Sequence, residues 1–146
     1  MNAYMNLACQ CATNNQDGGP FGAVIIKSNE VIAVCHNEVL KRKDPTAHAE
    51  IMAIRLASQK LNTYDLTGCV MYTTCEPCPM CLSAIIWSNI ETVYYGSTRN
   101  DAFQIGFRDK AIYDYLNGTK TDLLNIKQLD SSECSKLFEQ YKNTIY

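Results

Sequence analysis

The sequence has no run of about 18 consecutive apolar residues, the length that a helix needs to cross a membrane. Its first residues, MNAYMNLACQ, lack the basic start and the apolar stretch of a secretion signal. A strong charge of one sign is also missing, because 13 basic residues stand against 15 acidic ones. We therefore expect neither membrane insertion nor export. The near-equal numbers of basic and acidic residues disfavour binding to nucleic acid or to an anionic membrane.

Signs of disorder and of separate modules are missing as well. Hydrophobic residues make up 47% of the 146 residues and charged residues 19%, which is typical of a globular chain. No internal repeat, linker or low-complexity tract divides the sequence. We expect residues 1–146 to form a single domain with a substantial core.

Helical and strand patterns alternate along the chain. Helices are predicted for residues 2–15, 47–61, 77–88, 108–116 and 130–143. Strands are predicted for two runs within 21–39, joined by the turn "SNE", and for 69–74 and 92–97. Loops are expected at 42–46 and 99–107, and an edge strand or extended segment at 121–129. A strand–helix–strand unit requires a parallel crossover, so the order predicts a three-layer α/β/α sandwich with a central mixed sheet and helices on both faces.

Eight cysteines could form a disulfide framework in a short secreted chain, but no secretion signal accompanies them. They are better interpreted as thiols or metal ligands in a reducing cytoplasm. Five of them are predicted to be small buried hydrophobic residues: Cys9, Cys11, Cys35, Cys69 and Cys134. His36 has no partner of the metal-binding type in the sequence and is expected to be structural.

The other three cysteines lie in "TTCEPCPMC", residues 73–81. Cys78 and Cys81 are three residues apart at the start of a predicted helix, so both thiolates can reach one tetrahedral ion. His48, at the start of the helix predicted at 47–61, would complete three ligands. One His and two Cys predict one Zn²⁺ per chain with a fourth position for water, as in catalytic sites. A closed structural site with Cys75 or Glu50 as the fourth ligand is the alternative.

Glu50 follows His48 by two residues at the same helix start. At that spacing it can lie beside the metal without binding it, within reach of a water molecule at the open position. Cys75 precedes Pro77 at the end of a strand, where its sulfur is expected to point elsewhere. We therefore predict that Glu50 is a catalytic proton shuttle and that Cys75 is not a ligand.

The pattern H-x-E followed by P-C-x-x-C is the signature of zinc deaminases. "GGPFGAVI", "DPTAHAE", "TTCEPCPMC" and "GFRDKAIY", together with Asn37, Trp87 and a terminal tyrosine, resemble the small bacterial guanine deaminases of the cytidine deaminase-like superfamily. The resemblance covers most of the chain. It implies the cytidine deaminase-like fold and the hydrolysis of guanine to xanthine and ammonia.

The resemblance also implies a set of substrate contacts. Asn37 and Asp109 would hydrogen-bond the purine, Phe21 and Trp87 would wall the ring, and the backbone of Ala49 would add a polar contact. Without the resemblance, the two aromatic residues are more simply core residues. Asn37 could then serve a turn, and Asp109 could cap the helix predicted at 108–116.

The resemblance further implies a homodimer in which the C-terminal segment, from about residue 120, swaps between subunits. Tyr146 would then close the partner's site. Three other functions remain open: a tRNA adenosine deaminase, a deaminase of guanosine or cytosine, and a silent zinc module for protein association. The acidic balance argues against tRNA, and the presence of Glu50 argues against a silent module.

Overall fold

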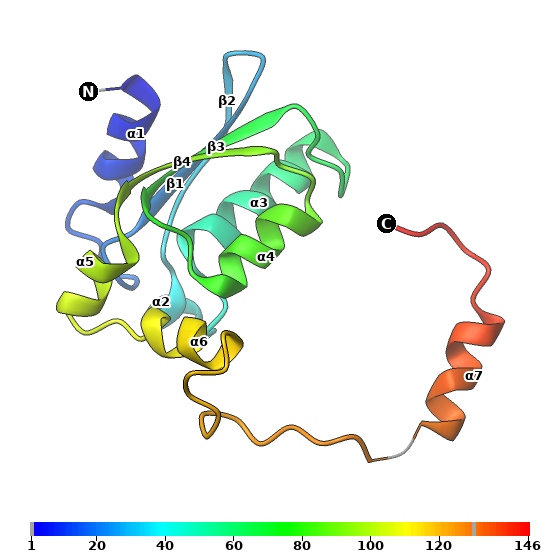
Figure 1. Ribbon diagram of the computed structural model, residues 1–146. Coiled ribbons are helices and arrows are strands. Elements are labelled where there is room, and N and C mark those ends of the chain that lie inside the picture. Colours follow the sequence, from blue (N-terminus) through cyan, green and yellow to red (C-terminus); the bar gives the residue numbers. More distant parts are fainter. Residues whose placement is uncertain (1, 130) are drawn as a thin grey trace.

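The computed structural model describes residues 2–129 and 131–146 of the chain (Figure 1). Its centre is a four-stranded sheet of order β2-β1-β3-β4. The strands are β1 (Gly22–Lys27), β2 (Glu30–His36), β3 (Cys69–Cys75) and β4 (Thr92–Ser97). Strand β1 pairs antiparallel with β2 and β3, and β3 pairs parallel with β4. The predicted mixed sheet is confirmed.

A tight turn joins β1 to β2. Ser28 and Asn29 both have positive φ, 51° and 63°, which matches the twist of a two-residue hairpin turn. Successive residues of β1 point to opposite faces: Ala23 and Ile25 join one core cluster, and Val24 joins another. Strand β1 is buried on both faces because helices cover both sides of the sheet.

The two faces carry different helices. Helix α1 (Ala3–Ala12) packs on one face, and α3 (Ala49–Leu61) packs on the other with α4 (Pro79–Trp87) beside it (Figure 1). Helix α4 is the crossover between the parallel strands β3 and β4. The predicted three-layer α/β/α sandwich is confirmed.

Several predicted boundaries need correction. Helix α3 begins at Ala49, not near Ala47, so His48 is its N-cap. Residues 39–42 form a short helix, α2 (Val39–Arg42), at the entrance to the loop predicted at 42–46. The loop predicted at 99–107 is correct only for residues 105–107. Residues 99–104 form helix α5 (Arg99–Gln104), whose start is stabilised by a capping box between Thr98 and Asp101.

The last third of the chain is only partly packed. Helix α6 (Asp109–Leu116) lies near α5 and α4, and residues 121–129 contain no strand. Helix α7 (Ser132–Gln140) stands apart from the body at the end of an extended segment (Figure 1). Asp130, which the sequence suggests as the cap of this helix, lies outside the described residues. We refer to residues 120–146 as the C-terminal arm.

All eight cysteines are free thiols. Cys69 is buried, and Cys9, Cys11 and Cys35 are half-buried, as small apolar residues of the helices and strands. Cys134 is exposed on α7, so its predicted burial is wrong. Within the described residues, no helix is long and apolar enough to cross a membrane.

Candidate metal centre and active site

Three side chains meet where two helices begin. His48 is the N-cap of α3, Cys78 is the N-cap of α4, and Cys81 lies in the first turn of α4. Each sulfur is 3.6 Å from His48 Nδ1. The three ligand atoms all lie within 4.8 Å of one another. The sequence prediction that these three residues converge is confirmed.

The spacing of these atoms fits zinc. A tetrahedral ion with Zn–S of about 2.3 Å and Zn–N of about 2.0–2.1 Å separates S from N by about 3.6 Å. Hydrogen bonds with the Cys81 side chain, the His48 ring and the Cys81 backbone lower the pKa of Cys78 to about 4, so this ligand is a thiolate at neutral pH. His48, Cys78 and Cys81 are the zinc ligands, and they leave the fourth position open.

Cys75 is not part of this group. It ends β3, is buried, and its thiol donates to the carbonyl of Thr98 at 3.6 Å. Burial raises the pKa of the Cys75 thiol to about 11, which keeps it protonated at neutral pH. A closed site with three cysteine ligands therefore does not match the geometry.

Glu50 lies in the first turn of α3 and is 5% exposed. The Thr73 hydroxyl, at the centre of β3, donates to Glu50 Oε1. Burial raises the pKa of the Glu50 carboxyl. A buried carboxyl beside an open metal position is well placed to take up and release a proton.

A small cavity opens beside the metal ligands, and three predicted substrate contacts line it: Phe21, Asn37 and Asp109. The Asn37 Oδ1 accepts the Val39 N–H at 3.0 Å, which leaves the amide NH₂ as the polar group for the cavity. Asp109 is the first residue of α6, and burial raises the pKa of its carboxyl. The N-cap of α6 is Arg108, so Asp109 does not cap this helix.

Two further residues, Phe107 and Glu76, line the cavity without being predicted from the sequence. The ring of Phe107 packs edge-on against that of Phe21, with centroids 4.8 Å apart. Ala49, the first residue of α3, is fully buried between His48 and Glu50. Its N–H belongs to the first turn of the helix, where backbone donors have no intrahelical partner.

Trp87 and Tyr146 lie elsewhere in this chain. Trp87 ends α4, at the opposite end from the metal ligands, and is 67% exposed. The two rings are 6.1 Å apart and line a separate surface cavity with Tyr64. A single chain does not bring either residue to the metal centre, so their roles stay predictions that require a second subunit.

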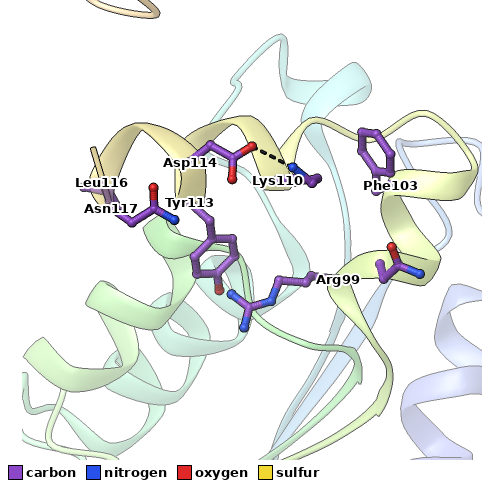
Figure 2. A pocket seen from close by; sticks show the side chains of 8 residues that line it. Arg99, Phe103, Lys110, Tyr113, Asp114, Leu116 and Asn117 are labelled. Carbon is purple, nitrogen blue, oxygen red and sulfur yellow. Dashed lines mark hydrogen bonds and ion pairs between the residues drawn. The ribbon is translucent and has the colours of Figure 1, made fainter. Parts of the chain in front are cut away.

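A polar network supports the segment before Cys78. The Tyr113 hydroxyl of α6 donates to the carbonyl of Pro77 at 2.7 Å. The Arg99 guanidinium lies against the Tyr113 ring (Figure 2), 4.0 Å from the ring centre. Arg99 also forms an ion pair with Glu76 at 3.5 Å. Helix α6, which carries Asp109, is thereby connected to the loop that carries a zinc ligand.

Residues 1–97 match the family described as the cytidine and deoxycytidylate deaminase zinc-binding region. Guanine deaminase of Bacillus subtilis is 50% identical over 109 residues, which cover 75% of this chain and 69% of that protein. Its crystal structure matches this chain with a TM-score of 0.89 and 37% identity, over 100% of this chain and 99% of that one.

Two other relatives are similar over shorter ranges. The tRNA-specific adenosine deaminase of Aquifex aeolicus is 50% identical over 78 residues, 53% of this chain and 52% of that protein. A solved structure in complex with 2,6-diaminopurine matches with a TM-score of 0.70 and 35% identity, over 73% of this chain and 61% of that one. The matched region contains the zinc ligands and Glu50, and the chain belongs to the cytidine and deoxycytidylate deaminase family of zinc-binding proteins.

Proposed function

We propose that this chain is a zinc-dependent guanine deaminase, which hydrolyses guanine to xanthine and ammonia. The observation that carries the proposal is the three-ligand centre with Glu50 buried at its edge, beside a cavity that offers an amide and a carboxylate. The likeness to the guanine deaminase of Bacillus subtilis over the whole chain supports guanine as the substrate.

The proposed chemistry divides between the metal and the protein. Zinc, when bound, supplies an activated water molecule as the nucleophile. Glu50 takes a proton from that water and passes it to the ring nitrogen next to C2 as the water oxygen bonds to C2. It then takes the remaining proton of that oxygen and gives it to the C2 amine, which leaves as ammonia as the C2–N bond breaks and the C2 carbonyl forms. One water is consumed, and one ammonia and one xanthine are formed. The raised pKa of Glu50 makes its carboxylate a stronger base, which favours uptake of the proton from water.

Side chains around the cavity hold the purine. The NH₂ group of Asn37 donates to acceptors of the base, and the carboxylate of Asp109 accepts a ring N–H. Phe21 and Phe107 exclude water from the apolar ring. The N–H of Ala49 adds a polar contact at the start of α3.

A homodimer with a swapped C-terminal arm completes this proposal. Helix α7 exposes Leu137 and Phe138, 68% and 84% exposed, and an isolated nine-residue helix is not stable in water. The body also exposes Trp87 and Ile86 of α4. An arm that crosses to a second subunit buries both apolar surfaces and brings Tyr146 to the partner's site.

We propose the cytoplasm as the compartment, because the reducing conditions there preserve thiolate ligands. Among the tRNA-specific adenosine deaminases, that of Aquifex aeolicus covers 53% of this chain, and that of Buchnera aphidicola covers 94% at 31% identity, below the 50% of the guanine deaminase. The net charge of −2 provides no general attraction for a phosphate backbone.

Ammonia release from guanine, guanosine, adenine, cytosine, cytidine and tRNA tests the proposal. We expect guanine to react fastest by at least about 100-fold in kcat/KM, because an unpaired buried polar group costs about 1–3 kcal/mol at each mismatched edge. Reaction of tRNA alone would contradict the assignment of Asn37 and Asp109.

A further inference from the structure

The loop at residues 15–19, which follows α1, lies directly against Asn37. The Asn15 amide donates from Nδ2 to the carbonyls of Asn37 and Gly19, each at 2.9 Å. Its Oδ1 accepts the Asp17 N–H at 3.0 Å. One half-buried amide therefore fixes the shape of the loop and connects it to the backbone of Asn37.

Asp17 connects the same loop to the residues on both sides of Asn37. Its carboxylate is 2.8 Å from Nε2 of His36, the last residue of β2. Its carbonyl accepts the N–H groups of Leu40 and Lys41 at 2.9 and 3.0 Å. The loop and the segment 36–41 are thus held together at four points, which explains His36 as a structural residue.

Gly18 touches the functional group of Asn37. A Cβ at this position would lie 2.0 Å from Asn37 Oδ1 and 2.9 Å from its Cγ. The φ of Gly18 lies outside the left-handed region, so the backbone conformation does not require glycine. The lack of space requires glycine, because any side chain at Gly18 must displace the Asn37 amide and break its hydrogen bond with the Val39 N–H.

Gly19 is similarly close to the aromatic rings of Phe21 and Phe107. A Cβ there would lie 2.8 Å from the ring of Phe21 and 3.0 Å from that of Phe107. The two adjacent glycines thus contact two different walls of one cavity, the amide and the rings.

We propose that Gly18 and Asn15 are positioning residues that set the place of the Asn37 amide and hence the recognition of the purine. The inference rests on the proposed function. It adds that the hydrogen-bonding edge of the site is formed by close contact with a loop from outside the metal centre. The zinc ligands lie on α3 and α4, so the loop affects substrate binding without affecting metal binding.

Gly18→Ala tests this inference, with Asn37→Ala and the double variant as partners. We expect Gly18→Ala to lower kcat/KM for guanine about 10- to 100-fold, mainly through KM, with zinc content unchanged. The Asn37→Ala variant lacks the amide. Adding Gly18→Ala to it should therefore lower kcat/KM by a further factor of less than about three. An equal loss in both backgrounds, full activity of Gly18→Ala, or loss of zinc would overturn the inference.

Gly118→Ala is the matched control. Gly118 has φ +82° and no atom within 4 Å of a Cβ, so this change strains the backbone without touching the site. We expect near-normal kcat/KM. If Gly18→Ala does not fold, Asn15→Asp removes the two donated hydrogen bonds with almost no change in size, and KM should rise about tenfold. An unchanged KM would contradict the proposal.

A readout that does not depend on turnover distinguishes failure of this inference from failure of the proposed function. If the unmodified protein releases no ammonia from guanine, the side-chain NH₂ resonances of Asn37 still report on the position of the amide. Gly18→Ala should shift these resonances, and Gly118→Ala should leave them in place. Unshifted resonances in Gly18→Ala would refute the positioning role whatever the substrate.

Discussion

Glu50→Gln separates proton transfer from metal binding. Glutamine has the size of glutamate, and its carbonyl oxygen can still accept the Thr73 hydroxyl, so the fold and the ligand positions should survive. What is lost is a group that can take and return a proton. General acid–base catalysis contributes about 10²- to 10⁴-fold, and Glu50 is proposed to act in both halves of the reaction. We therefore expect kcat to fall by about 10³-fold or more, which is about 4 kcal/mol of barrier.

The assay for this variant has three parts: kcat from ammonia release, zinc per chain by elemental analysis, and thermal stability. We expect one zinc per chain and a near-normal unfolding temperature beside the loss of turnover. Turnover within tenfold of the unmodified protein, with zinc bound, would refute Glu50 as the proton shuttle. Loss of zinc would show that Glu50 is a fourth ligand.

The swapped arm predicts that a mixture of Glu50→Gln and Tyr146→Ala chains, unfolded and refolded together, regains activity, because one site of each hybrid has both residues intact. Absence of rescue would place Tyr146 in its own chain's site or in none. Tyr113→Phe should weaken zinc binding about tenfold in competition with a chelator, since the buried Pro77 carbonyl loses its donor beside Cys78; unchanged affinity would show that the bond does not position this ligand. Hydrogen bonds from Thr67 and Asn89 lower the pKa of Asp65, so its contribution to stability is complete above the unfolded-state pKa and is lost as the pH falls through the folded-state pKa. Asp65→Asn should therefore reduce the loss of unfolding temperature between pH 7 and about pH 3, and an unchanged loss would contradict this role.

The metal centre was predictable because short spacings in the sequence identify its ligands. The three-residue spacing of Cys78 and Cys81 at a helix start fixes their relation. His48 stands at the start of a second helix, two residues before Glu50. The hairpin and the core strands were predictable for the same reason, from runs of Val and Ile around a polar turn.

Other features depend on distant contacts. Phe107 lines the cavity only because the chain after β4 folds back against Phe21, and no local pattern indicates this. Helix α5 is hard to predict although Thr98 and Asp101 have the spacing of a capping box, because the glycine that follows at position 106 suggests a loop. The roles of Trp87 and Tyr146 depend on how the C-terminal arm and a second subunit pack, which a single sequence does not determine.

Zinc titration into metal-stripped protein, with xanthine formation from guanine as the readout, tests the central claim most directly. The account predicts that activity is absent without metal, rises in proportion to added zinc, and reaches its plateau at one zinc per chain. Full xanthine formation by the stripped protein, or no xanthine at one bound zinc per chain, would contradict it.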